Sequence, residues 1–477
     1  MAKGDDLIRM TARQVVALLE RRQVSPLELI DAAMARIEAV DGAVNALPIR
    51  SIERAREQAR RLPRPPEDRR GWLGGLPLAI KDSMDVAGMR STHGSPIYAD
   101  HVPAASDLQV EALEGRGGIV LARSNAPEFA AGSNTFNEVF GSTLNPWNTA
   151  MTCGGSSGGS AVAVATGEVW LANGSDLGGS LRIPASFCSV VGLRTSPGLV
   201  PQGPAKHLYD GLAVSGPMAR NIGDLALMLD AMAVFDARDP LSVEPPARPF
   251  LEGVDEAGKH PPRRVGFSRD LGFLPVDAEV AGIAEAAAWR FAERGAAVEA
   301  AGPDFSGASE IFQTLRAVRF AANYAPLLPE HRARIKPDVI WNIEKGLKLD
   351  GEAVGRAMRE RAALYSRVVR FFAEYDLLAT PAVIVPPFPV GQRYVEEVAG
   401  RRFDNYVDWL GMSYAVTLVG CPALSLPCGF TRSGLPVGIQ LVGRPRGERH
   451  LLAAAALLEE QLGLARLLPI EPRPAPG

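Results

Sequence analysis

The first sixty residues place apolar side chains three or four positions apart, which is the spacing of amphipathic helices. Thr11 and Gln14 fit a capping box at one helix start, and Ser25 and Glu28 fit a second. Gly42 supplies a stop signal for the second of these helices. The pattern predicts a helical N-terminal segment, residues 1–65, that packs on the remainder of the chain.

Further along, short apolar runs alternate with helical stretches. The runs over 76–80, 118–122 and 169–173 are typical of buried strands, whereas 110–115 and 158–166 have helical patterns. Alternation of this kind predicts an α/β fold in which helices cover both faces of a sheet. We expect residues 66–470 to form the main domain, in one structural unit with the N-terminal helices.

Composition and charge exclude several classes of protein. Of the 477 residues, 47% are hydrophobic and 22% are charged, and the formal net charge is −3. These values are typical of a globular protein and give no basic field for nucleic acid. The chain has no run of 18 apolar residues, and its polar start is not followed by an apolar signal segment. We therefore expect a cytoplasmic protein without a membrane span.

The four cysteines form no recognisable metal motif, and no motif places a histidine as a catalytic partner. The spacings of the four cysteines do not match a zinc site, so we expect free thiols, no metal and no cofactor. Cys153 is a candidate catalytic thiol, although a small buried core residue is the commoner outcome. A Ser-His-Asp triad stays open, because triads assemble in space rather than in sequence. The six histidines are scattered along the chain: His93, His101, His207, His260, His331 and His450.

Three polar residues stand in glycine-marked segments: Lys81 in 75–82 (GLPLAIKD), Ser156 in 154–159 (GGSSGG) and Ser180 in 175–185 (SDLGGSLRIPA). A serine hydroxyl is a weak nucleophile until a base takes its proton. Lysine serves as that base when burial lowers its pKa, and a second serine can relay the proton because a hydroxyl both donates and accepts. Glycines let backbone N–H groups converge on one point, which creates an oxyanion hole.

These segments, in this order, resemble the amidase signature family of serine hydrolases. Similarity continues at 145–148 (NPWN), 190–194 (VVGLR), 216–220 (GPMAR), 420–427 (GCPALSLP) and 434–440 (GLPVGIQ), so that it covers nearly the whole chain. The resemblance implies one large α/β domain, built on a mixed twisted sheet of about eleven strands with helices on both faces. Strand count does not follow from periodicity alone.

By the same resemblance, Ser180 is the nucleophile, Ser156 relays protons, and Lys81 acts first as base and later as acid. The peptide bond before Ser156 is cis in relatives. The implied oxyanion donors are the backbone N–H groups of Leu177, Gly178, Gly179 and Ser180. The implied supporting residues, which hold the glycine loops, are Ser157, Asp176, Arg182 and Asp82.

Other interpretations of these motifs stay open. A glycine-rich turn before a helix can bind phosphate, but no Gly-Lys-Ser/Thr ending is present. Residues 154–158 fit the Gly-x-Ser-x-Gly elbow of other hydrolases, yet that elbow follows a buried strand and 148–153 has a poor strand pattern. A non-catalytic binding protein on this scaffold is a further alternative.

The family members cut fatty amides, aryl amides, peptide amides, ureas and carbamates. Mostly apolar candidate walls favour a small uncharged amide, anilide or carbamate, as in the aryl acylamidases and urethanases, although each wall residue is as readily plain core. These candidates are Phe129, Phe136, Phe140, Leu144, Tyr209, Ile340 and Trp341. The rival hypothesis is the A subunit of a glutamyl-tRNA amidotransferase. We expect a monomer or homodimer that binds a small molecule and no nucleic acid or membrane.

Overall fold

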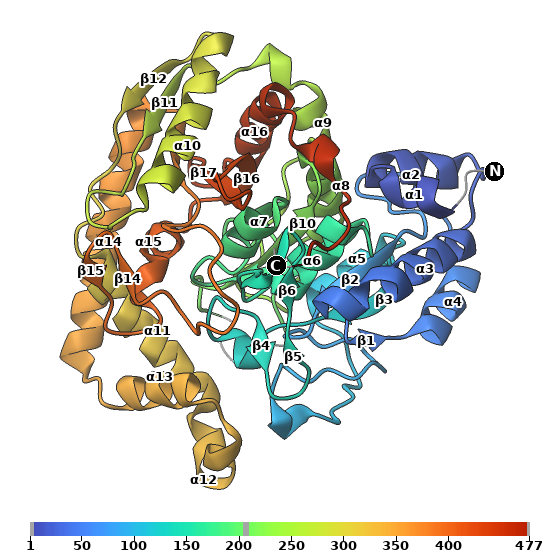
Figure 1. Ribbon diagram of the computed structural model, residues 1–477, viewed down its shortest axis with the longest axis horizontal. Coiled ribbons are helices and arrows are strands. Elements are labelled where there is room, and N and C mark those ends of the chain that lie inside the picture. Colours follow the sequence, from blue (N-terminus) through green and yellow to red (C-terminus); the bar gives the residue numbers. More distant parts are fainter. Residues whose placement is uncertain (1–3, 204–208, 475–477) are drawn as a thin grey trace.

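The computed structural model describes residues 4–203 and 209–474. Its chain opens with four helices, drawn in blue in Figure 1: α1 (Gly4–Arg9), α2 (Ala12–Glu20), α3 (Pro26–Val44) and α4 (Ile52–Arg60). Both expected capping boxes are present, since Thr11 and Ser25 exchange hydrogen bonds with Gln14 and Glu28. The helical interpretation of this segment is thus confirmed.

Helix α3 runs past Gly42, and the expectation of a stop there is wrong. Asn45 takes the left-handed conformation, with φ of 54°, and caps the helix instead. Glycine is the commonest residue in this left-handed position at a helix end, and asparagine is also found there. A glycine within a helix costs only about 1 kcal/mol relative to alanine, and burial of the neighbouring Val40 and Val44 outweighs that cost.

An eleven-stranded mixed sheet forms the centre of the molecule, as expected. Strands β2, β3 and β8 are parallel to one another, as are β11, β12 and β13, whereas the strands between these groups pair antiparallel. Across the sheet the order is β1 (Ile49–Arg50), β3 (Ile119–Ser124), β2 (Pro77–Lys81), β8 (Leu171–Asp176), β10 (Val214–Ala219), β9 (Val191–Arg194), β16 (Ala423–Phe430), β17 (Pro436–Val442), β13 (Leu377–Pro381), β11 (Arg264–Phe267) and β12 (Ala297–Ala300).

Helices flank this sheet along its length (Figure 1). Helices α6, α7 and α8 are buried along their whole length; most of their residues are apolar or small, and the charged Arg182, Asp224 and Asp230 are buried with them. The helices after the N-terminal four are α5 (Leu108–Gly115), α6 (Gly158–Thr166), α7 (Arg182–Cys188), α8 (Ile222–Met232), α9 (Phe250–Asp255), α10 (Ala278–Trp289), α11 (Ala308–Tyr324), α12 (Leu328–His331), α13 (Pro337–Leu347), α14 (Gly351–Glu374), α15 (Gly411–Val419) and α16 (Glu448–Leu462).

Among residues 4–203 and 209–474, three hairpins lie outside the main sheet: β4 (Phe136–Asn137) with β5 (Gly141–Ser142), β6 (Leu144–Asn145) with β7 (Asn148–Thr152), and β14 (Glu397–Val398) with β15 (Arg401–Arg402). The expectation that residues 148–153 would make a poor strand is wrong, because β7 spans most of this segment. It is nevertheless a half-exposed hairpin strand and not a buried strand of the central sheet.

The N-terminal segment belongs to the same α/β domain as the rest. Strand β1 pairs antiparallel with β3, joining Ile49 to Arg123, and thereby forms one edge of the main sheet. Helix α3 contributes Leu29 and Ile30 to the largest buried apolar cluster. The chain therefore folds as a single domain, while a boundary near residue 65 remains a prediction.

The sheet brings together the segments that carry the chemical motifs. Strands β2 and β8 run parallel and pair through Leu78–Leu171 and Ala79–Ala172, so their carboxyl ends lie at one edge. Strand β2 ends at Lys81, and β8 ends at Asp176, just before Ser180. Ligand sites in α/β proteins commonly form outside the carboxyl ends of such strands.

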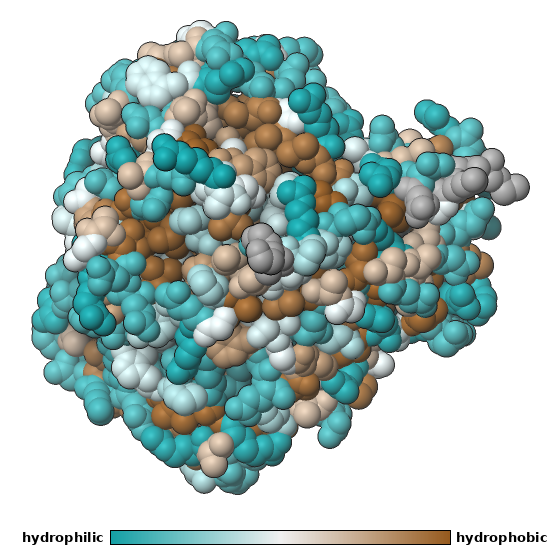
Figure 2. Space-filling model, viewed as in Figure 1, coloured by the Kyte–Doolittle hydropathy of each residue, from teal (hydrophilic) through white to brown (hydrophobic). Residues whose placement is uncertain are grey.

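The surface mixes polar and apolar residues. In the face drawn in Figure 2, hydrophilic side chains occupy most of the outline and apolar patches lie between them. Among the described residues, none of the helices combines the length and the apolar character needed to cross a membrane.

Candidate active site

Lys81 is fully buried at the end of β2 and is surrounded by hydroxyl groups. Its Nζ lies 2.6 Å from Ser156 Oγ and 3.0 Å from both Ser157 Oγ and Ser175 Oγ. Burial lowers the pKa of Lys81 to about 7, although the negative charge of Asp176 opposes this shift. Near neutral pH a substantial fraction of the amine is therefore uncharged and has a free lone pair.

The two serines of the GGSSGG tract follow a tight backbone path. The peptide bond between Gly155 and Ser156 is cis, as the family resemblance implies. Helix α6 begins directly afterwards at Gly158, where a Cβ atom would lie 2.2 Å from Thr135 Oγ1. Only glycine fits at that position, and the close approach fixes the serines against Lys81.

Ser180 lies in the turn between β8 and α7 and is 8% exposed. Its carbonyl oxygen accepts a hydrogen bond of 3.1 Å from the Ser157 backbone N–H, which ties the two serine segments together. Ser156 and Ser180 both line one cavity. The structure thus brings the three residues of the proposed triad to one place in the fold.

A buried ion pair holds the turn before Ser180. Arg182 donates to both oxygens of Asp176, at 2.8 and 3.0 Å, and Arg194 lies 3.5 Å from the same carboxylate. Burial alone would raise the pKa of Asp176, but the two guanidinium groups hold it well below its usual range. Asp176 is therefore ionised at neutral pH, and removing one partner would leave a buried charge unpaired.

The glycine turn differs in one respect from the expected oxyanion hole. The Gly179 N–H donates to Asp176 Oδ1 at 2.9 Å, so it is already engaged. Gly179 has φ of 107°, and a Cβ there would lie 2.5 Å from Ser413 Oγ. Gly179 thus shapes the turn rather than offering a free N–H group.

The alternative nucleophiles fit less well. All four cysteines are free and buried, and burial raises the pKa of Cys153 to about 12, so its thiol stays protonated. Of the histidines, His93 and His101 line the cavity, whereas His207 lies outside the described residues. Within the described part of the chain, no histidine hydrogen-bonds to Ser156 or Ser180.

Comparison with known proteins agrees with these motifs. The family model described as Amidase matches residues 28–452. An acylamidase of Rhodococcus erythropolis is 34% identical over 455 residues, which cover 94% of this chain and 95% of the relative. The A subunit of glutamyl-tRNA(Gln) amidotransferase from Moorella thermoacetica is also 34% identical, over 490 residues that cover 97% and 99%.

The chain belongs to the amidase signature family. Two solved structures support this at the level of the fold, each with 27% identity and a TM-score of 0.87. A bacterial aryl acylamidase of the same family covers 97% of this chain and 99% of its own. A 6-aminohexanoate cyclic dimer hydrolase covers 98% and 99%. The protein is thus an amidase, and the cleavage of amides is its class of reaction.

The cavity of this amidase has a volume of about 400 Å³ and an aromatic wall. Phe129, the one expected wall residue that lines it, stacks on Tyr324 with ring centroids 4.5 Å apart. Phe320 and Tyr98 make edge contacts with these two rings. Phe320 and Tyr324 come from one face of α11, and the motifs gave no signal for either.

The other expected wall residues lie outside the cavity lining: Phe136, Phe140, Leu144, Tyr209, Ile340 and Trp341. Most belong to small hairpins or to α13, where they contact other side chains. Phe136 and Phe140 pack against Lys336 and Arg90. Tyr209 is 83% exposed, and Ile340 packs behind the aromatic wall. An apolar residue near a motif in sequence need not face its cavity.

Polar side chains contribute much of the remaining lining, beside apolar residues such as Met84, Leu177 and Ala213. The lining carries the ionisable and amide groups of Asp85, His93, His101, Asp107, Gln109, Gln202, Arg319 and Asn323. Burial, together with the charge of Asp85, raises the pKa of Asp107 to about 7. The cavity therefore offers hydrogen-bonding groups as well as an aromatic surface.

We expect Gly179→Ala to abolish most of the activity and to lower stability. The new Cβ would collide with Ser413, and alanine at this φ is strained, which typically costs about 1–3 kcal/mol. Gly282→Ala, in α10 with no atom within 4 Å of the added Cβ, is the matched control and should leave activity unchanged. Turnover and thermal unfolding of both variants measure the effect. Normal turnover in Gly179→Ala would contradict a turn fixed by this glycine.

Proposed function

We propose that this amidase hydrolyses the C–N bond of small uncharged amides, anilides or carbamates through Ser180, Ser156 and Lys81. The observation that carries the proposal is the fully buried Lys81 Nζ, 2.6 Å from Ser156 Oγ, beside the cavity that Ser156 and Ser180 line. This arrangement supplies a neutral amine and a hydroxyl relay next to a second hydroxyl, with no histidine required.

Acylation follows from these positions. The uncharged Lys81 amine takes the proton of Ser156, which takes the proton of Ser180, and the Ser180 oxygen attacks the carbonyl carbon. The tetrahedral oxyanion accepts hydrogen bonds from backbone N–H groups of the glycine turn; one such donor is typically worth about 3–4 kcal/mol. The C–N bond then breaks as Ser156 passes a proton to the leaving nitrogen and regains one from Lys81.

Deacylation reverses the proton path. A water molecule gives its proton through Ser156 to Lys81 and attacks the acyl carbon, after which the bond to the Ser180 oxygen breaks and Ser180 is reprotonated. A carbamate needs no further catalytic group, because the same oxyanion forms at its carbonyl. The products are then an amine, an alcohol and carbon dioxide.

The aromatic wall supports an aryl substrate. Offset and edge contacts between aromatic rings contribute about 0.5–1.5 kcal/mol beyond the area they bury. Tyr324, stacked on Phe129, and the neighbouring Phe320 offer such contacts to an anilide or aryl carbamate. The aryl acylamidase with the same fold is in line with this choice.

A second candidate is the A subunit of a glutamyl-tRNA amidotransferase, which the 34% identity to such a subunit favours. One panel separates the two functions: p-nitroanilides, aryl carbamates, ureas, primary amides and glutamine, with mass spectrometry of Ser180. Turnover of aryl substrates with an acyl adduct on Ser180 supports our proposal. Ammonia release from glutamine alone, or co-purification with a partner subunit, would support the rival instead.

We expect Tyr324→Leu to raise KM for a p-nitroanilide by up to about tenfold, because leucine cannot replace ring-on-ring contact. KM for a small aliphatic primary amide should change little, since that substrate makes no such contact. Tyr365→Leu, at an exposed position of α14, is the control. Equal changes in KM for both substrates would argue against an aromatic subsite at Tyr324.

A further inference from the structure

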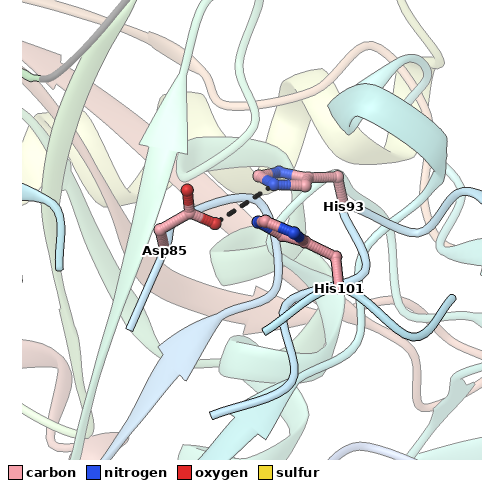
Figure 3. Close-up of side chains that lie close together, drawn as sticks. All are labelled: Asp85, His93 and His101. Carbon is pink, nitrogen blue, oxygen red and sulfur yellow. Dashed lines mark ion pairs between the residues drawn. The ribbon is translucent and has the colours of Figure 1, made fainter. Parts of the chain in front are cut away.

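Two histidines and an aspartate meet in the segment that follows β2. Asp85, His93 and His101 each present one ligand atom, and these three atoms all lie within 4.8 Å of one another. His93 Nε2 is 3.2 Å from Asp85 Oδ1. Figure 3 shows the imidazole rings of His93 and His101 lying one above the other, with the Asp85 carboxylate beside them. All three residues line the cavity that contains Ser156 and Ser180.

The donor set fits a first-row divalent metal ion. Two imidazoles and one carboxylate form a common ligand combination, and imidazole suits zinc, copper, iron and nickel. Two ligand atoms that are each about 2.0–2.2 Å from one ion stand a little over 3 Å apart. The Asp85–His93 separation of 3.2 Å already meets this requirement, and His101 needs a small side-chain adjustment.

The backbone around both histidines is held in place before any ion binds. His93 has φ of 52°, an uncommon conformation for a residue with a side chain, and its carbonyl accepts from Phe129 N at 2.8 Å. The preceding Thr92 N–H donates to the buried Asp82 carboxylate. The His101 carbonyl accepts from Ser91 N, and its own N–H donates to Tyr98. A site whose backbone is already fixed binds an ion at a lower entropic cost, because fewer loop residues must become ordered.

The cluster also has a buried acceptor that lacks a well-directed hydrogen bond. Asp85 Oδ1 is buried and has no hydrogen bond of acceptable geometry among the described residues, although His93 Nε2 lies near it. Buried carboxylate oxygens are normally satisfied, so this lone pair calls for a ligand. Asp107 and Arg319 line the same cavity, so the preference for a cation rests on the Asp85 carboxylate and the two imidazoles themselves.

We propose that Asp85, His93 and His101 bind one divalent transition-metal ion, with Zn²⁺ as the expected occupant, in the wall of the catalytic cavity. Three protein ligands leave coordination positions open toward the cavity. The hydrolysis through Ser180, Ser156 and Lys81 requires no metal, so the ion acts on access to the serines and not on the chemistry. Occupancy therefore hinders substrate binding, and Zn²⁺ inhibits by raising KM.

Calorimetry with Zn²⁺ alone tests the site directly. Tag-free protein is stripped with a chelator, dialysed and titrated; we expect one equivalent to bind. His93→Ala, His101→Ala and Asp85→Asn should each weaken binding at least about tenfold, which is the scale seen when ligand support is lost. His450→Ala, at an exposed position of α16, is the matched control and should bind like the wild type.

Two results would overturn the proposal: no Zn²⁺ binding to the wild type, or unchanged affinity in His93→Ala and His101→Ala. Circular dichroism checks that the variants fold. If His93→Ala does not fold, His101→Gln takes its place in the binding test, because it replaces a solvent-exposed ring by a polar side chain. Ser180→Ala should bind Zn²⁺ normally while losing hydrolysis. Failure of the metal site is thereby distinguished from failure of the proposed hydrolase.

Discussion

Ser180→Ala is expected to reduce hydrolysis at least several hundredfold while leaving the fold intact. The hydroxyl oxygen is the atom that would form the bond to the acyl carbon, and residual turnover after loss of such a nucleophile comes only from the oxyanion hole and binding. The residue is 8% exposed, and its one described contact to Ser157 uses the backbone carbonyl, which alanine retains. Stability should therefore change little.

The measurement pairs turnover on a p-nitroanilide with mass spectrometry of the enzyme during turnover. The wild type should carry an acyl group on Ser180, whereas the variant should carry none. Ser366→Ala, an exposed serine on α14, controls for generic effects of the substitution. Undiminished turnover in Ser180→Ala, or an adduct at another serine, would show that the nucleophile had been assigned wrongly.

Much of this site could be predicted from sequence because its parts are local. The glycine-rich turn around Ser180 and the tract around Ser156 each follow a backbone path that few residue types other than glycine permit. The residue types at these positions are therefore restricted, and the motifs can be recognised in the sequence. The convergence of these segments with Lys81 follows from parallel pairing of β2 and β8, which the alternation of strands and helices indicates. The strand count, in contrast, rested on the family resemblance alone.

The lining of the cavity could not be predicted, because it depends on contacts between distant segments. Phe320 and Tyr324 reach the cavity from α11, more than a hundred residues after Ser180. Their spacing of four residues marks one helix face, but such a face is as often plain core. Phe136 and Phe140 lie closer in sequence to the serines, yet short hairpins direct them elsewhere. Proximity in sequence is a poor guide outside a tight turn.

The histidine cluster and Ser175 were missed for different reasons. His93 and His101 are eight residues apart in irregular structure, a spacing that matches no metal motif, and only their position shortly after Lys81 could have drawn attention. Ser175 stands inside a recognised segment, but its contact with Lys81 Nζ at 3.0 Å depends on where β8 ends. Together with Ser156 and Ser157 it completes three hydroxyl partners for one amine.

The second prediction concerns Lys81 and depends on whether its amine is protonated. Lys81→Met keeps the length and burial of the side chain but removes the base, so activity should fall as far as in Ser180→Ala. In the wild type, kcat/KM should decline about tenfold per pH unit below pH 7, because the pKa of Lys81 is lowered to about 7 by burial and only its uncharged form accepts a proton. A profile that stays flat into the acid range would contradict a lysine base.

Stability gives an independent check on the same pKa, with a defined sign. Between pH 7 and 10.5 the unfolded lysine is protonated while the folded one is neutral, so the unfolded chain binds one more proton. The free energy of unfolding should therefore rise with pH in this window, by about 1.4 kcal/mol per unit from this group, and not below it. Lys81→Met lacks this contribution, so the difference in unfolding free energy between the two proteins should change by about 2 kcal/mol between urea titrations at pH 7 and at pH 9. A constant difference would mean that Lys81 remains protonated in the folded enzyme and that the base must be another group.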